Sequence, residues 1–130
     1  MKVFTLKKRK DFVKAAKGFK AVVNGLVLQA AFALPKKPVD VCFVGYTATK
    51  KLGKAHVRNF TKRRLREAAR IVMPKNALSG VNYVIIGRHN TTSLNFSYLT
   101  KKLTEAVSSV NEQILQQEKH NDKKSNDCTD

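Results

Sequence analysis

The sequence is poor in acidic residues, in cysteine and in long apolar runs. Its 130 residues include 26 Lys and Arg but only 9 Asp and Glu, which gives a formal net charge of +17. This imbalance excludes a protein that meets only neutral metabolites, because such a chain repels itself unless an anion binds it. Cys42 and Cys128 lie too far apart in the sequence for a metal-binding pair. The cysteines therefore predict neither a disulfide framework nor a zinc site.

No apolar run reaches the length of about 18 residues that would span a membrane. The first residues, MKVFTLKKRKDF, are too charged for a signal peptide. We therefore expect a cytoplasmic protein with no membrane partner. The apolar share of 42% is near the globular norm, which predicts a folded basic protein rather than a disordered basic tail.

The charge is unevenly distributed along the chain. Residues 1–110 hold 23 basic and 4 acidic side chains, whereas residues 111–130 hold 3 basic and 5 acidic ones. Residues 116–130 contain one cysteine as their only apolar residue and bury too little surface to offset their ordering entropy. The sequence predicts one domain over residues 1–115 and a disordered polar tail over residues 116–130.

Hydrophobic spacing and turn residues predict three helices and four strands in the order αβββαβα. The helices are expected at about 7–17, at about 54–72 and from Asn95 through Ile114, and the strands at 19–23, 26–34, 39–47 and 81–87. Asn24-Gly25 predicts a hairpin, Pro35 and Pro38 the end of its second strand, and Met73-Pro74 the end of the second helix. This pattern is typical of an α+β fold whose helices cover at least one face of a sheet.

The segment from Thr49 to Arg70 contains nine basic residues and one acid, Glu67. On a helical projection, one side carries what we call the cationic arc: Arg58, Asn59, Lys62, Arg63, Arg66 and Arg70. The opposite side is apolar: Val57, Thr61, Leu65, Ala68, Ile71 and Val72. Like charges at this spacing repel one another, so the arc predicts a bound polyanion rather than a solvated face. Arg64 projects into the apolar side, so either its side chain reaches the edge or the helix is rotated.

Several motifs resemble one family closely. Lys50-Lys51, Gly53-Lys54-Ala55, Arg58-Asn59 and Lys62 to Glu67 resemble the Arg-Asn-Arg signature of the protein subunit of bacterial ribonuclease P. The resemblance covers about residues 4–110, and it departs from the usual pattern at Phe60 and Thr61. It implies an α/β sandwich with three helices on a single four-stranded mixed sheet. It also implies a left-handed βαβ crossover, against the general right-handed rule.

The resemblance implies two RNA partners: a large catalytic RNA and the single-stranded 5′ leader of precursor tRNA, which the complex removes by hydrolysis. The residues implied to face the catalytic RNA are Arg58, Asn59, Lys62, Arg63 and Arg66, extended by Lys50, Lys51 and Lys54. Phe12 matches the phenylalanine of a leader cleft, where rings stack on bases.

Core packing is the competing role for Phe12, and it is the favoured role for Phe19 and Phe32. Ala16 and Gln29 stand where relatives can have aromatic residues. The strength of leader binding is therefore open.

The acids of the basic region, Asp11, Asp40, Glu67 and Glu105, are scattered along the sequence, and so are His56, His89 and His120. Hydrolysis by the protein would need a base and an acid, or paired carboxylates with metal ions. We expect no catalytic side chain and no metal site in the protein. The resemblance likewise implies that Mg²⁺ is held mainly by the RNA. No obligate protein partner is evident from the sequence.

Three alternatives remain at the level of sequence. A ribosomal protein would explain the charge equally well, but it would not explain the contiguous match over residues 53–67. A DNA-binding module would need a dimerising element or base-reading amides beyond Asn59. A stand-alone nuclease would need the missing carboxylates.

Overall fold

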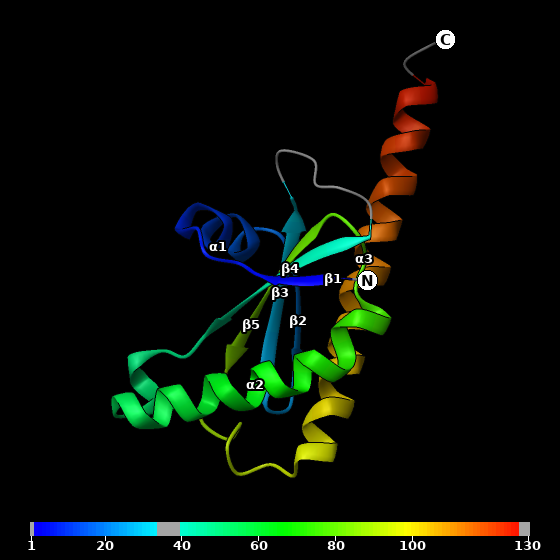
Figure 1. Cartoon of the computed structure of the whole chain (residues 1–130). Helices are drawn as coiled ribbons and strands as arrows, with labels where there is room; N and C mark the ends of the chain where they lie inside the picture. Colours follow the sequence, from blue (N-terminus) through cyan, green and yellow to red (C-terminus); the bar gives the residue numbers. More distant parts are fainter. Residues whose placement is uncertain (1, 34–39, 128–130) are drawn as a thin grey trace.

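The computed structural model describes residues 2–33 and 40–127. Figure 1 shows the elements, which are β1 (Lys2–Thr5), α1 (Arg9–Ala16), β2 (Phe19–Val23), β3 (Leu26–Phe32), β4 (Val41–Thr47), the short 3-10 turn η1 (Lys50–Leu52), α2 (Ala55–Asn76), β5 (Val81–Gly87) and α3 (Phe96–Asp127). The α+β class and the three helices are confirmed. Pro35, Pro38, Val39 and Cys128 lie outside the described residues.

The sheet has five strands in the order β1-β4-β5-β3-β2, so the predicted count of four is wrong. The additional strand, β1, pairs in parallel with Val41–Val44 of β4. Sequence patterning missed it because β1 has only four residues and three of them are exposed. Backbone pairing at the sheet edge defines this strand, and side-chain alternation contributes little. The sheet is mixed, as expected, because β4 pairs in parallel with β1 and β5, whereas β3 pairs antiparallel with both β5 and β2.

Helices cover both faces of the sheet. α2 and α3 pack together on one face, and α1 lies on the other over β3 and β5 (Figure 1). The main core lies beneath α2 and α3 and includes Leu28, Leu65, Ile85 and Leu103, none of which is exposed. A smaller core lies beneath α1. The unit β4-α2-β5 is the parallel crossover that the resemblance implies, and its left-handed sense stays a prediction.

Two predicted element boundaries differ from the structure. α2 continues past Pro74 to Asn76, so the predicted end before this proline is wrong. Proline removes one helical hydrogen bond, but Met73 is fully buried and the Asn76 side chain donates to the Val72 carbonyl at 2.8 Å. This packing holds the last turn. α3 continues to Asp127 through most of the polar stretch, and the division at residue 115 stays a prediction.

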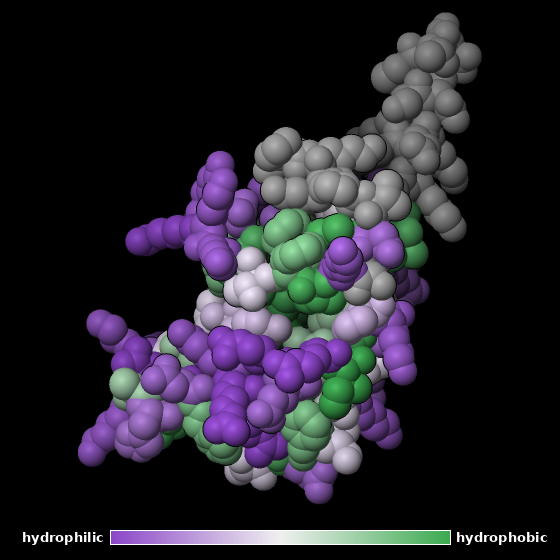
Figure 2. All heavy atoms as spheres, viewed as in Figure 1, coloured by the Kyte–Doolittle hydropathy of each residue, from purple (hydrophilic) through white to green (hydrophobic). Residues whose placement is uncertain are grey.

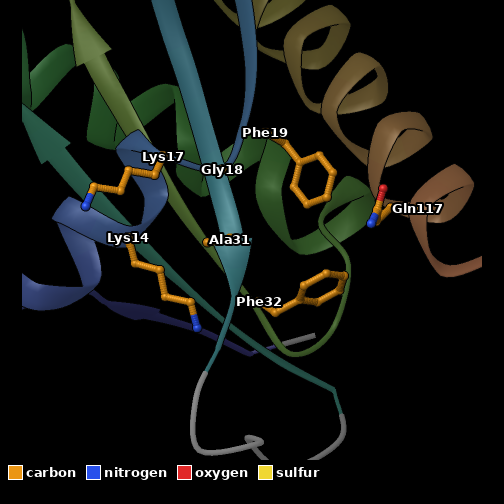
Figure 3. Close-up of a pocket in the computed structure, with 7 residues that line it drawn as sticks. All are labelled: Lys14, Lys17, Gly18, Phe19, Ala31, Phe32 and Gln117. Atoms are coloured by element: carbon orange, nitrogen blue, oxygen red, sulfur yellow. The ribbon is translucent and has the colours of Figure 1, made fainter. Parts of the chain in front are cut away.

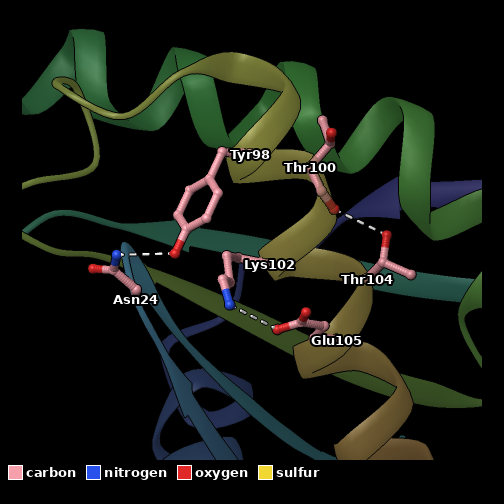
Figure 4. A network of polar contacts seen from close by, with 6 residues as sticks. All are labelled: Asn24, Tyr98, Thr100, Lys102, Thr104 and Glu105. Carbon is pink, nitrogen blue, oxygen red and sulfur yellow. Dashed lines mark hydrogen bonds and ion pairs between the residues drawn. The ribbon is translucent and has the colours of Figure 1, made fainter.

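The predicted hairpin at Asn24-Gly25 is confirmed and is tied to the start of α3. Gly25 has a φ of 101°, a left-handed conformation that favours glycine. The Asn24 amide donates to the Tyr98 hydroxyl at 3.2 Å (Figure 4). The Thr91 hydroxyl donates to the Gly25 carbonyl at 2.6 Å, so the loop before α3 is fixed to the same turn.

A buried tyrosine joins three elements at the other end of α2. The Tyr83 hydroxyl of β5 accepts a hydrogen bond from the Leu78 amide at 2.8 Å and donates to Asn111 of α3 at 2.6 Å. Asn111 in turn donates to the Asn76 carbonyl at the end of α2, also at 2.6 Å. Burial raises the pKa of Tyr83 well above its usual value.

We predict that Tyr83→Phe lowers the free energy of unfolding by about 1–3 kcal/mol at pH 7, because buried polar partners lose their hydrogen bonds. Urea denaturation followed by circular dichroism measures this difference. Because the pKa of Tyr83 is raised in the folded state, the advantage of the wild type is complete below about pH 10 and shrinks above it, where the unfolded tyrosine ionises. A difference that does not change with pH would contradict this assignment.

Candidate nucleic-acid interface

α2 is held against the sheet by a strip of small and apolar side chains. The strip consists of Thr61, Leu65, Ala68, Ala69, Val72 and Met73. The Thr61 hydroxyl donates to the Val57 carbonyl at 2.9 Å, so its burial leaves no unpaired hydroxyl. The Thr61 methyl group lies where a side chain on Gly87 would stand, so the glycine lets α2 approach β5 closely.

The helix is rotated from the position that the projection predicts. Ala69 and Met73 are buried, whereas Ile71, which the projection places on the apolar side, is 54% exposed. The prediction for Ile71 is therefore wrong. The projection records only the sequence, whereas the surface against which the helix packs sets the buried strip. As a result, Arg58 and Lys62 lie at the edge of this strip and are half-buried.

The remaining members of the cationic arc point outward along one side of α2. Asn59, Arg63, Arg66 and Arg70 are exposed, and hydrophilic side chains predominate along this helix in Figure 2. Arg63 forms an ion pair with Glu67 at 3.3 Å, with both side chains open to solvent. Exposed pairs at this spacing contribute little, about 0.3–0.5 kcal/mol. The pairing leaves most of the positive charge of the arc uncompensated.

The three lysines that precede α2 lie at its N-terminal end. Lys50 and Lys51 belong to η1, Lys54 is the residue before the first helical turn, and all three are exposed. Gly53 has a φ of 123°, which joins η1 to α2 within a tight turn. Lys54 provides no side-chain cap, so no side chain at the cap position accepts from the free N–H groups of the first turn. Positive charge and free N–H donors meet at this end.

Arg64 has a structural role that the signature conceals. Its guanidinium donates to the Thr92 carbonyl at 3.0 Å and to the Leu94 carbonyl at 2.6 Å. Both carbonyls belong to the loop between β5 and α3. The one sequence signal for this role is that Arg64 projects away from the cationic arc.

Phe12 lies between α1 and the sheet. Its ring rests against Gly45 of β4, where an added Cβ would stand 2.5 Å from the ring edge. The ring packs with the smaller core but remains half-buried, so it has both a packed and an open side. Gln29 is half-buried on the same face of the sheet, and Ala16 is exposed on α1.

A second aromatic site near α1 is separate from Phe12. Phe19 and Phe32 meet edge to face, with ring centroids 6.0 Å apart. They line a pocket of about 320 Å³ with Lys14, Lys17 and Gln117 (Figure 3). Both rings pack against the main core, as predicted.

The acids and histidines of the described residues are not gathered into a metal-binding cluster. This part of the chain contains no group of three or more His, Cys, Asp or Glu that could hold a metal ion. Burial raises the pKa of the Cys42 thiol to about 11, so it stays protonated near neutral pH. None of the helices described is long and apolar enough to span a membrane.

The fold and the cationic arc define a small basic α+β protein with one surface suited to a polyanion. Comparison with known families is more specific: the sequence profile of the Ribonuclease P family matches residues 1–111. The chain therefore belongs to the ribonuclease P protein family. This membership decides against the ribosomal and DNA-binding alternatives.

Curated relatives support the assignment. The chain is 48% identical to the ribonuclease P protein component of Gluconacetobacter diazotrophicus over 103 residues, which cover 78% of this chain and 86% of that one. It is 43% identical to the component from Paramagnetospirillum magneticum over 107 residues, which cover 81% and 80% of the two chains. The fold is also similar to the ribonuclease P protein of Thermotoga maritima, with a TM-score of 0.64 and 24% identity over 78% of this chain and 92% of that one.

The different environments of Arg63 and Arg64 allow a direct test of whether the hydrogen bonds of Arg64 stabilise the fold. We predict that Arg64→Met lowers the free energy of unfolding by about 1.5–3 kcal/mol, because two hydrogen bonds from a charged donor are removed. Arg63→Met, the matched control, should change it by less than about 0.5 kcal/mol. Urea denaturation of the two variants measures this difference. Equal stability would show that the hydrogen bonds of Arg64 to the loop contribute nothing.

Proposed function

We propose that this chain is the RNA-binding component of ribonuclease P in the cytoplasm. It binds the catalytic RNA through the cationic arc and the lysines before α2, and the 5′ leader of precursor tRNA through the Phe12 side of the sheet. It thereby assists endonucleolytic removal of the leader. The observation that carries the proposal is the exposed positive charge along one side of α2, in a chain of this family.

Electrostatics favours RNA as the ligand of α2. Arginine forms paired hydrogen bonds with phosphate oxygens, and the arc repeats cations along the helix. Contacts with about five phosphates would give a logarithmic salt slope of roughly −3.5 to −4.5. Binding would also relieve the repulsion among neighbouring cations on the helix.

The chemistry of cleavage is assigned to the RNA. Mg²⁺ ions held mainly by the catalytic RNA would activate water there, and the protein would bring the two RNAs together by neutralising their phosphates. No protein side chain is given a catalytic role in this proposal. The scattered acids of the basic region support this division of labour.

Reconstitution tests the proposal directly. Purified protein and ribonuclease P RNA are assayed separately and together on precursor tRNA at low Mg²⁺ concentration. We expect cleavage to require the RNA and to be faster when the protein is present. Cleavage by the protein alone, or no acceleration by it, would contradict the proposal.

The role of the cationic arc in RNA binding can be tested by replacing two of its arginines with uncharged polar side chains. We predict that Arg63→Gln with Arg66→Gln weakens binding to the catalytic RNA and flattens the salt slope by roughly 1 for each phosphate that is no longer neutralised. The affinity is measured across a series of salt concentrations. Lys101→Gln on the exposed side of α3 is the control for a general charge effect. An unchanged slope in the double variant would show that the arc is only solvated.

The proposed role of Phe12 predicts a selective loss. Phe12→Leu keeps an apolar side chain against Gly45 but removes the ring that would stack on a leader base. We expect affinity of the holoenzyme for precursor tRNA to fall by about 5- to 150-fold, as for the loss of one stacked base, and affinity for mature tRNA to stay unchanged. Val13→Ala, on the exposed side of α1, is the control. An equal loss for both tRNAs would instead indicate a folding defect.

A further inference from the structure

A pocket of about 350 Å³ lies between the C-terminal half of α2 and the edge of the sheet at β1. Tyr46 of β4 and Val3 of β1 line it from the sheet, and Arg66 and Arg70 line it from the helix. Val3 and Tyr46 also pack against the main core beneath α2 and α3, so the pocket lies on the α2 side of the sheet. Figure 1 shows β1 beside this half of the helix. The pocket thus joins the cationic arc to the sheet.

One arginine of the pocket is held over an aromatic ring. The guanidinium carbon of Arg66 lies 5.5 Å from the centroid of the Tyr46 ring, within the distance of a cation–π contact. Tyr46 is half-buried and packs against the main core, so the sheet fixes its ring. A long, flexible side chain loses conformational entropy when it binds a ligand. A ring that already restricts Arg66 lowers this cost.

The second arginine brings another positive charge to the same place. Arg70 follows Arg66 by about one helical turn, and both are exposed. Burial raises the pKa of Tyr46 and both guanidinium groups oppose this effect, so both lie near its ring. Within the described part of the chain, neither arginine forms an ion pair with a carboxylate. Both charges are therefore available to an anion.

We propose that Arg66 and Arg70 together bind one backbone phosphate of the RNA that lies along α2, and that Tyr46 is the positioning residue that holds Arg66 for this contact. The proposal rests on the proposed function and deepens it, because the phosphate belongs to the same RNA. Guanidinium groups bind phosphate oxygens through paired hydrogen bonds. Tyr46 has no contact with the phosphate in this proposal and acts through Arg66.

The convergence of the two arginines favours one shared phosphate over two separate ones. Side chains four residues apart on a helix are neighbours, and here both line one pocket beside one ring. Like charges at this spacing repel each other. A phosphate between the two guanidinium groups would remove the repulsion, and its oxygens could accept hydrogen bonds from both.

A double-mutant cycle tests the role of Tyr46. Tyr46→Leu removes the ring but keeps an apolar side chain, and Tyr46→Phe keeps the ring. We expect Tyr46→Leu to bind ribonuclease P RNA about 2- to 30-fold more weakly, the range that corresponds to one cation–π contact, and Tyr46→Phe to bind like the wild type. In an Arg66→Gln background, Tyr46→Leu should have no further effect, because its partner is gone. No loss in either background, or an equal loss in both, would overturn the positioning role.

Tyr98→Leu on α3 is the matched control for the loss of a ring beside a cation. The Lys102 ammonium lies 5.2 Å from the centroid of the Tyr98 ring, but this lysine is already paired with Glu105 and lies off the cationic arc. We expect the control to bind the RNA like the wild type, with circular dichroism showing that every variant is folded. A loss as large as that of Tyr46→Leu would contradict a specific role for Tyr46.

The salt dependence of binding tests whether the two arginines share a phosphate. Arg66→Gln with Arg70→Gln should flatten the logarithmic salt slope by roughly 1, because one phosphate is no longer neutralised. Two separate phosphates would give a change of roughly 2. A change of roughly 2, or none, would overturn the shared phosphate while the proposed function stands. If the wild type itself binds ribonuclease P RNA no better than an unrelated RNA of equal length, the proposed function fails as well.

Discussion

The close contact between α2 and β5 orients the helix that carries the cationic arc. Thr61 can approach Gly87 because the glycine has no side chain, and the Thr61 hydroxyl is satisfied within its own helix. The contact fixes the rotation of α2, and that rotation decides which side chains face solvent. A small change in rotation would bury a cation or expose Leu65, and burying an unpaired charge is costly. The cationic arc is therefore a consequence of packing as much as of sequence.

The elements with strong periodic signals could be predicted from the sequence. The hairpin at Asn24-Gly25, the strand at residues 81–87 and the helix that carries the cationic arc all follow from local patterns. β1 could not be predicted, because a short edge strand gains its stability from backbone pairing with β4, about 40 residues away. The exposure of Ile71 and the helical turn after Met73 likewise depend on tertiary contacts that no local pattern encodes.

The candidate site could be predicted in outline but not in its division of labour. The signature places Arg63 and Arg64 side by side, yet the first is open to solvent and the second holds the loop before α3. The projection does separate them, since Arg64 falls on the apolar side, but only the structure identifies its partners. Of these two adjacent arginines, one is thus open to solvent and the other is fixed to a loop of the protein itself.

Successive residues of β4 support the two faces of the protein. Gly45 lies beneath Phe12 on the α1 side, and Tyr46 lies beneath Arg66 on the α2 side. Because neighbouring side chains of a strand point to opposite faces, a shift of β4 by one residue would exchange these two supports. β4 is held between β1 and β5, and each pairing fixes its register. β1 therefore does more than extend the sheet, because it helps fix the register that holds Phe12 and Arg66 in place on opposite faces.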